Sequence, residues 1–478
     1  MAKTIRLTMA QALVKYLTAQ MVEIDGKEVP YFAGAWAIFG HGNVAGLGEA
    51  LYQVREELPT YRAHNEQGMA HAAIGFGKAT KRQRAMIATS SIGPGATNMI
   101  TAAALAHVNR LPVLFLPGDV FVRRTPDPVL QQVENFADPT ISANDCFRPV
   151  SRYFDRISRP EQIITSLPQA MATLLDAADC GPVTLSLPQD VQGEAFDYPK
   201  EFFAKKLHHL HRAEPDVRAL AQAAEALKSA KKPLIVAGGG VHYSQGFDAL
   251  RSFAETHQIP VCETQGGKAS LPHRHGLQLG GLGVTGSDAA NAVAAEADVI
   301  LAVGTRLGDF ATGSRTLMND ATIIGLNAAR FDAIKHNALP LRADAKQGLK
   351  ALSSALNGWK SDEKWVKNAL NNAEKWQKTS ADYTKNHERE RPSDAEVVGA
   401  VARQEKMLGE VTVVAAAGSF PAELERHWPP SDPDSYHVEY GYSCMGYEIA
   451  GAIGAKMATP NREVIVFVGD GSYLMLNS

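Results

Sequence analysis

Short apolar runs that end in glycine-rich turns recur along this chain, and helix-like stretches follow them. Residues 85–92, 233–237 and 464–468 are such runs, and the turns after them contain Gly93, Gly238 and Gly469. Apolar runs of this length, rich in β-branched residues, are typical of buried parallel strands. The alternation of strand and helix therefore predicts an α/β protein built on doubly wound parallel sheets.

The 478 residues predict roughly three domains, each long enough to bury a core of its own. We place the domains at residues 1–200, 210–357 and 393–478, with a charge-rich linker and surface helix at 358–392. The strand predicted at 464–468 stands close to Ser478. Domains seldom end just after a central strand, so we expect the third domain to be incomplete and the chain to be truncated at its C-terminal end.

The composition excludes several function classes. With 45% hydrophobic and 21% charged residues and a net charge of −3, the chain predicts a soluble globular protein with no nucleic-acid or membrane partner. Cys146, Cys180, Cys262 and Cys444 lie far apart and form no CxxC pair. This spacing predicts reduced thiols, a cytoplasmic location and oxygen ligands for any metal ion.

Three motifs carry the functional prediction. Glu66 opens a helix crowded with glycine and alanine, which predicts that another segment packs very close to it. Gly93-Pro94-Gly95 begins a second helix, and Gly469-Asp470-Gly471-Ser472 follows a strand. Glycines at a strand end let backbone N–H groups approach an anion, and an aspartate between them can hold a divalent cation. Taken singly, the motifs also fit an ordinary turn or a first-turn glutamate that stabilises the helix dipole.

One cofactor would need all three motifs, and here the sequence resembles the thiamine-diphosphate-dependent enzymes. The resemblance rests on His64–Ala70, Gly93–Asn98, Met445-Gly446-Tyr447 and Gly469–Ser472, in the order and spacing of that family. It implies that Glu66 forms a hydrogen bond to the aminopyrimidine of thiamine diphosphate, that Gly93 also binds the cofactor and that Met445 supports the bent cofactor. It further implies that Asp470 binds Mg²⁺. The residues implied to face the diphosphate are Gly418, Ser419, Phe420, Gly471 and Ser472.

Longer stretches are similar to one branch of that family, the cyclic-dione hydrolases of inositol catabolism. These stretches are residues 8–14, 38–44, 126–134, 187–194 and 304–310. The resemblance implies a small cyclic dione as substrate, hydrolysis of a C–C bond, and a homodimer or tetramer with the active site between subunits. Besides Glu66, the candidate catalytic residues come from loops at strand ends, where α/β folds bind ligands. They are His41, Asn43, Gln131 and Gln132.

Other functions remain open from the sequence. Carboligation of 2-oxoacids, as in acetolactate synthase, is the alternative within the family. Gly238-Gly239-Gly240 after a strand also allows a nucleotide-binding oxidoreductase, although the third glycine of the dinucleotide motif is missing and Glu263 is the only acidic candidate for a ribose ligand. A non-catalytic regulatory paralogue is a third possibility, but it would have no need of Glu66 and Asp470.

Overall fold

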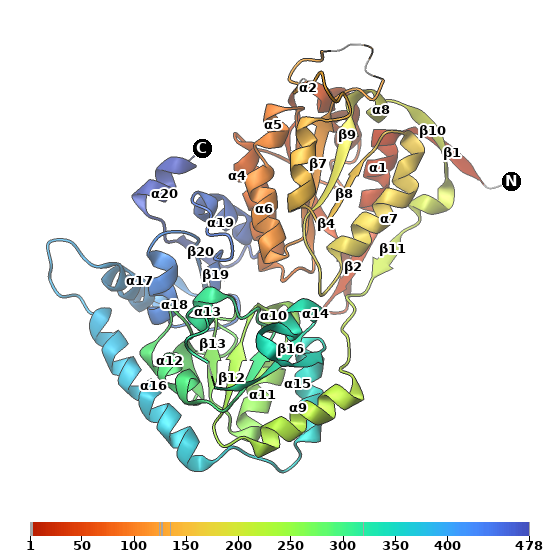
Figure 1. Cartoon of the computed structure of the whole chain (residues 1–478). Helices are drawn as coiled ribbons and strands as arrows, with labels where there is room; N and C mark the ends of the chain where they lie inside the picture. Colours follow the sequence, from red (N-terminus) through yellow and green to blue (C-terminus); the bar gives the residue numbers. More distant parts are fainter. Residues whose placement is uncertain (1–2, 124, 126–127, 134, 319, 478) are drawn as a thin grey trace. The chain divides into compact units, whose positions relative to one another are not determined.

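The computed structural model describes residues 3–123, 125, 128–133, 135–318 and 320–477 (Figure 1). The chain divides into two compact units. Unit 1 comprises residues 1–210, 446–460 and 473–478, and unit 2 comprises residues 211–445 and 461–472.

A six-stranded parallel sheet forms the centre of unit 1, with the strand order β5-β4-β6-β7-β9-β8. Every residue of β6, β7 and β9 is buried, as expected for parallel strands covered on both faces. The strands are β4 (Phe32–Ile38), β5 (Thr60–Arg62), β6 (Ala85–Ser90), β7 (Val113–Asp119), β8 (Tyr153–Arg156) and β9 (Val183–Pro188).

Helices cover both faces of this sheet, with α1 and α7 on one side and α4 and α6 on the other (Figure 1). Helix α1 begins with the capping box that Thr8 forms with Gln11. The helices of unit 1 are α1 (Met9–Thr18), α2 (Gly40–Asn43), α3 (Glu49–Gln53), α4 (Glu66–Ala79), α5 (Pro94–Thr97), α6 (Ile100–Asn109), α7 (Ile163–Leu174), α8 (Gln189–Gln192) and α19 (Tyr447–Ala458), with a π-helical turn η1 (Val44–Gly48) and 3₁₀ turns η2 (Ala143–Val150), η3 (Pro160–Gln162) and η4 (Lys200–Phe203).

Helix α19 packs directly on α4, which confirms that the small residues of α4 serve a close approach. A Cβ atom at Gly75 would lie 2.2 Å from the Gly451 carbonyl oxygen, and one at Gly454 would lie 2.0 Å from the Ala72 carbonyl oxygen. Larger side chains at these glycines would force the two backbones apart.

Two small sheets complete unit 1. One is an antiparallel pair, and the other places a hairpin beside a third strand. The strands are β1 (Thr4–Thr8) with β10 (Ala195–Pro199), and β2 (Gln20–Ile24) with β3 (Lys27–Pro30) and β11 (Lys206–His208).

Unit 2 contains a second six-stranded parallel sheet and a parallel sheet of three strands, ordered β14-β13-β12-β15-β16-β17 and β19-β18-β20. The three parallel sheets formed by the described residues confirm the predicted fold class. The strands of unit 2 are β12 (Pro233–Ala237), β13 (Val261–Glu263), β14 (Gln278–Gly281), β15 (Val299–Val303), β16 (Thr322–Asn327), β17 (Leu339–Arg342), β18 (Val411–Ala415), β19 (Tyr436–Val438) and β20 (Glu463–Val466).

The charge-rich stretch predicted as a linker contains one long helix, α16 (Glu363–Tyr383), of which one face is buried. Trp365 is 5% exposed, and its indole N–H donates a hydrogen bond to the Pro233 carbonyl at 2.9 Å. The other helices of unit 2 are α9 (Val217–Ser229), α10 (Gly239–Tyr243), α11 (Phe247–His257), α12 (Asp288–Glu296), α13 (Asp309–Thr312), α14 (Arg330–Ala333), α15 (Ala345–Ala355), α17 (Asp394–Leu408) and α18 (Phe420–His427), with the 3₁₀ turn η5 (Lys335–Asn337); α20 (Asp470–Met475) begins in unit 2 and ends in unit 1.

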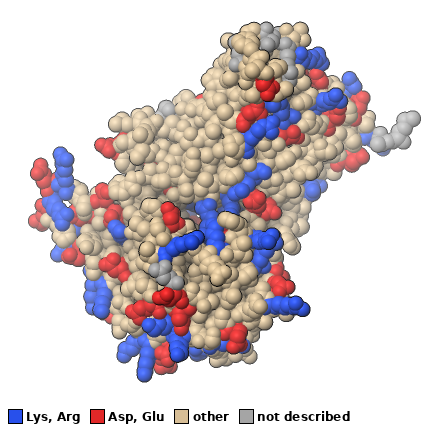
Figure 2. Space-filling view, in the orientation of Figure 1, with Lys and Arg blue, Asp and Glu red and all other residues tan. Residues whose placement is uncertain are grey.

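The surface and the thiols agree with the composition. Both signs of charge occur over the face drawn in Figure 2, and all four cysteines are free. Within the described residues, no helix is both long and apolar enough to cross a membrane.

Candidate functional site

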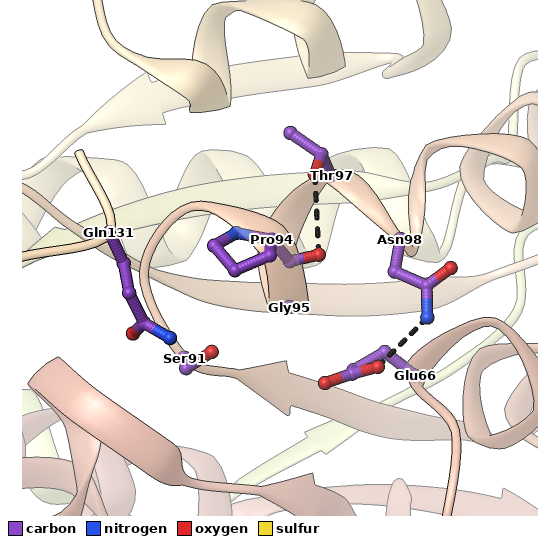
Figure 3. Close-up of a pocket in the computed structure, with 7 residues that line it drawn as sticks. All are labelled: Glu66, Ser91, Pro94, Gly95, Thr97, Asn98 and Gln131. Atoms are coloured by element: carbon purple, nitrogen blue, oxygen red, sulfur yellow. Dashed lines mark hydrogen bonds between the residues drawn. The ribbon is translucent and has the colours of Figure 1, made fainter. Parts of the chain in front are cut away.

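Helix α4 presents Glu66 as its first residue. The side chain of Asn65 caps the helix by accepting a hydrogen bond from the Gly68 N–H at 2.9 Å. The half-buried carboxyl group of Glu66 therefore stands at the positive end of the helix dipole. Its Oε2 atom accepts a hydrogen bond from the Asn98 amide at 2.8 Å, which fixes the orientation of the carboxyl group (Figure 3).

The Gly93–Gly95 turn follows β6 and opens α5, and its two glycines are needed for different reasons. Gly93 has a φ of +67°, and a Cβ atom there would lie 1.8 Å from the Gln131 carbonyl oxygen. At Gly95, a Cβ atom would lie 2.4 Å from Ser91 Oγ and 3.1 Å from Glu66 Oε1. The missing side chain of Gly95 thus leaves space directly in front of the glutamate.

These residues surround a pocket of about 610 Å³ in unit 1. Gln131 lies on the opposite side of the pocket from Glu66 and Asn98 (Figure 3). The lining is mostly polar and consists of Glu66, Ser91, Pro94, Gly95, Thr97, Asn98 and Gln131. A pocket with one carboxyl group, an amide that orients it and an open glycine fits the polar edge of an aminopyrimidine ring.

The other predicted catalytic residues lie close to this pocket but do not line it. The His41 carbonyl accepts a hydrogen bond from the Ile92 N–H at 3.1 Å. Ile92 directly follows the pocket residue Ser91, so His41 lies near the pocket. The buried Nε2 atom of His41 has no hydrogen-bond partner among the described residues. Gln132 uses its side chain to accept a hydrogen bond from the Val129 N–H at 3.3 Å, so it supports the turn that presents Gln131.

Asn43 is fully buried, and its amide group is committed to internal hydrogen bonds. Its N–H₂ group donates to Thr89 Oγ1 and to the Ser90 carbonyl, both at 2.8 Å, and its Oδ1 atom accepts from Gln192 at 3.0 Å. These bonds join α2 to the end of β6, one residue before Ser91 of the pocket, and to α8. They favour a supporting role for Asn43 over contact with a substrate.

The sequence motifs do not single out Ser91, Thr97 or Asn98 as functional, although Thr97 and Asn98 lie within the Gly93–Asn98 motif. One signal in the sequence points to Asn98 as a site residue. It stands at the end of the short helix α5, which the Gly-Pro-Gly turn begins. Within the stretch 126–134, Pro126, Asp127 and Glu134 lie outside the described residues.

The residues predicted to face the diphosphate lie in unit 2, around the start of α18. Gly418 has a φ of +81°, with open space where a Cβ atom would stand. The Ser419 hydroxyl donates a hydrogen bond to Asp394, and Phe420 packs on Phe467 with ring centroids 5.3 Å apart. Met445 is 43% exposed, so its side chain is free to contact a ligand.

Asp470 opens α20 after β20, with an exposed carboxyl group. Cβ atoms built at Gly469 and Gly471 would meet nothing within 4 Å, so a ligand has room beside the backbone there. Asp470 Oδ1 accepts a hydrogen bond from the Gly471 N–H at 2.8 Å, and Ser472 is buried. Among the described residues, no three His, Cys, Asp or Glu side chains gather into a metal-binding group. Asp470 would therefore need further ligands from the diphosphate, water or backbone.

Comparison with known proteins identifies the class. The chain matches the thiamine pyrophosphate enzyme N-terminal TPP binding domain over residues 37–138, the central domain over 220–352 and the C-terminal TPP binding domain over 416–478. The chain belongs to the thiamine pyrophosphate enzyme family. The Glu66 pocket lies within the first match, and Asp470 lies within the last.

Individual relatives are more specific. The 3D-(3,5/4)-trihydroxycyclohexane-1,2-dione hydrolase of Geobacillus thermodenitrificans is 49% identical, over 99% of this chain and 77% of that protein. Proteins of the same name from Bacillus anthracis and Bacillus thuringiensis are each 46% identical, over 100% of this chain and 78% of the relative.

Proposed function

We propose that this protein is a thiamine-diphosphate-dependent hydrolase that opens the ring of 3D-(3,5/4)-trihydroxycyclohexane-1,2-dione. The observation that carries the proposal is the identity of 46–49% to hydrolases of that name over nearly the whole chain. The reaction breaks the C–C bond between the two carbonyl carbons with addition of water. One carbon becomes a carboxylate and the other takes up a proton, which gives an open-chain deoxyuronic acid, 5-deoxyglucuronate, as an intermediate of inositol catabolism.

The Glu66 pocket supports the part of the proposal that concerns the aminopyrimidine. Bound thiamine diphosphate supplies a carbon nucleophile for carbonyl groups. Glu66 would hold a proton at the ring edge with the oxygen that faces Gly95, while Asn98 keeps the carboxyl group in place through its other oxygen. Gln131, on the far side of the pocket, is placed to contact a substrate hydroxyl or carbonyl group (Figure 3).

The open backbone at Gly469 and Gly471 supports a diphosphate and Mg²⁺ at the start of α20. Asp470 would bind the metal ion, and Gly471, Ser472 and the Gly418-Ser419-Phe420 turn would contact the diphosphate. Met445 would support the cofactor from its exposed position. Replacement of Asp470 by alanine should abolish the Mg²⁺ dependence of cofactor binding, and unchanged Mg²⁺ dependence would exclude Asp470 as the ligand.

We further propose that the protein is a homodimer or tetramer and that its active site is completed between subunits. The support is the family resemblance, because enzymes of this family build the site from two subunits. Light scattering of active protein checks the proposal, since a monomeric mass near 51.4 kDa would contradict it. The four free cysteines support a reducing, cytoplasmic location.

The substrate is tested by comparing two reactions. Protein supplied with thiamine diphosphate and Mg²⁺ should consume the cyclic dione and release the open-chain acid, and turnover should stop when the cofactor is omitted. The same protein should not convert pyruvate to acetolactate at a comparable rate. Preference for pyruvate would assign the chain to the carboligases and overturn the proposed substrate.

A further inference from the structure

A loop between β7 and η2 carries Gln131 to the pocket. It starts after Asp119, the last residue of β7, and ends at Ser142, whose hydroxyl caps η2 by accepting from the Asn144 N–H at 3.2 Å. The Gln131 carbonyl lies against Gly93, and its side chain forms the wall of the pocket opposite Glu66. The loop between these two ends therefore supplies one wall of the pocket.

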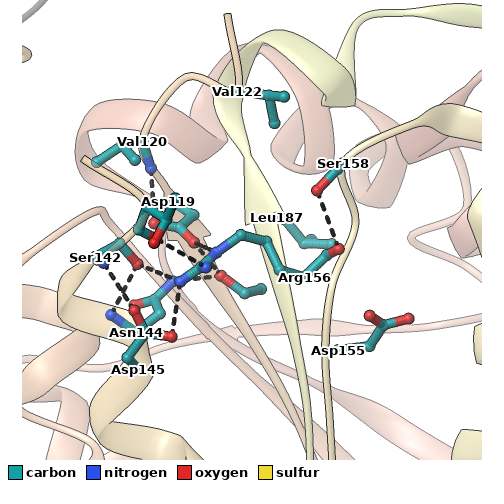
Figure 4. Close-up of polar contacts among 12 residues, drawn as sticks. Asp119, Val120, Val122, Ser142, Asn144, Asp145, Asp155, Arg156, Ser158 and Leu187 are labelled. Carbon is teal, nitrogen blue, oxygen red and sulfur yellow. Dashed lines mark hydrogen bonds and ion pairs between the residues drawn. The ribbon is translucent and has the colours of Figure 1, made fainter. Parts of the chain in front are cut away.

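One side chain from outside the loop joins its two ends. Arg156, at the end of β8, lies with its guanidinium group between Asp119 on one side and Ser142 and Asp145 on the other (Figure 4). Its contacts are Nε to Asp119 Oδ2 at 2.8 Å, Nη2 to Ser142 Oγ at 2.7 Å, Nη1 to the Thr140 carbonyl at 3.3 Å and Nη2 to Asp145 Oδ1 at 3.1 Å.

The contact between Arg156 and Asp119 is well shielded from water. The side chain of Asp119 is 2% exposed and that of Arg156 is 21% exposed. Burial opposes the charge of Arg156, but the carboxylates of Asp119 and Asp145 outweigh it and raise the pKa of the guanidinium group. Arg156 is thus held charged in a site where its loss would leave a buried carboxylate without its cation.

Further hydrogen bonds connect this cluster to the central sheet. Asp119 accepts a hydrogen bond from the Ser186 hydroxyl, which lies on β9. The Asn144 amide donates to the Gly118 carbonyl at 2.9 Å and to Ser186 Oγ at 2.8 Å. The loop ends are therefore fixed to three adjacent strands, β7, β9 and β8.

We propose that Arg156 is a positioning residue that sets substrate recognition by clamping both ends of the loop that carries Gln131. The inference rests on the proposed function for its substrate, and Arg156 itself does not line the pocket. A planar guanidinium group with several fixed donors can bind the two loop ends at once. A lysine ammonium group in the same place can keep the charge and one contact, but it cannot donate to both loop ends at once as the planar guanidinium group does.

The test compares Arg156→Lys and Gln131→Ala, singly and together, in the cofactor-loaded protein. Arg156→Lys should raise the KM for the dione roughly ten-fold, while the Kd for thiamine diphosphate changes less than about two-fold. If Arg156 acts through Gln131, the effect of the lysine variant on KM should largely disappear in the Gln131→Ala background. The matched control is Arg6→Lys, which alters an exposed pair with Asp197 in the same unit.

A second measurement does not depend on the substrate. Hydrogen exchange of peptides covering residues 128–145 should become at least about three-fold faster in Arg156→Lys, with wild-type exchange in β6 and α4. Unchanged exchange in these peptides, or fully additive effects of the two substitutions on KM, would overturn the positioning role. If the protein does not turn over the dione, only the proposed function fails, and the exchange measurement still decides the role of Arg156.

Discussion

At the scale of single residues, the candidate site depends on what glycines leave out. Gly95 borders both Ser91 Oγ and Glu66 Oε1, at distances where a methyl group would intrude on the carboxyl group. By contrast, a Cβ atom at Gly193 would meet its first neighbour, the Asp190 carbonyl oxygen, only at 4.0 Å. The two glycines lie in the same unit and therefore form a matched pair.

Gly95→Ala should weaken binding of thiamine diphosphate by about ten-fold or more, because the added methyl group takes space that the aminopyrimidine needs beside Glu66. Calorimetric titration of the folded variants measures this directly. Gly193→Ala should bind the cofactor as the wild type does. Equal affinities for the two variants would show that the space in front of Glu66 is not used by the cofactor.

The same residues show what a sequence can and cannot predict. The Gly93–Asn98 motif predicts a turn into a helix, and the structure confirms it. That Gln131 closes over Gly93 depends on a contact between residues far apart in the chain, which no local pattern records. The buried hydrogen bonds of Asn43 could not be predicted for the same reason. An asparagine in a loop at a strand end can face either a ligand or the core, and the sequence does not distinguish the two.

At the scale of elements, α18 connects the two parallel sheets of unit 2 through buried charges. Lys268 donates to the Glu425 carbonyl in the last turn of α18 at 2.9 Å, and the Glu425 carboxyl group accepts from the Thr285 hydroxyl. Glu263, at the end of β13, accepts from the Leu271 N–H at 2.9 Å. Glu263 is thus 1% exposed and used internally, which removes the support for a ribose ligand at this position.

These buried carboxyl groups predict a pH-dependent stability. Burial raises the pKa of Glu425 to about 7, although Thr285 and Lys268 lower it in part. Because the folded protein holds this proton more tightly than the unfolded chain does, the contribution of Glu425 to the free energy of unfolding should fall as the pH rises from about 5 to about 7.

Glu425→Gln keeps the shape of the side chain and removes the charge, so the melting temperature of the wild type should decrease relative to that of the variant as the pH rises over this range. Each kcal/mol lost from the free energy of unfolding lowers the melting temperature by roughly 2–4 °C. Glu374→Gln on α16 is the control, since that side chain is 66% exposed and pairs with Lys378 on the surface of the helix. Identical profiles of melting temperature against pH for wild type and Glu425→Gln would show that the charged form of Glu425 does not destabilise the folded protein.

At the scale of the whole molecule, the rhythm of strand, glycine turn and helix was enough to predict three parallel sheets. It was not enough to predict the short strands β14 and β19, which have three or four residues and little apolar periodicity. Their pairing is decided by neighbouring strands of the sheet and not by local sequence. Strand β20 ends at Val466, two residues earlier than expected, because its length too is set by pairing with a neighbouring strand.

The family match and the Glu66 pocket converge on one claim, that the carboxyl group of Glu66 moves a proton for bound thiamine diphosphate. Exchange of the C2 proton of the bound cofactor against D₂O, followed by acid quench and NMR, is the most direct measurement. In Glu66→Gln the exchange should slow by roughly 10²–10⁴-fold while the affinity for the cofactor stays within about three-fold. Exchange as fast as in the wild type, at equal cofactor occupancy, would contradict the claim.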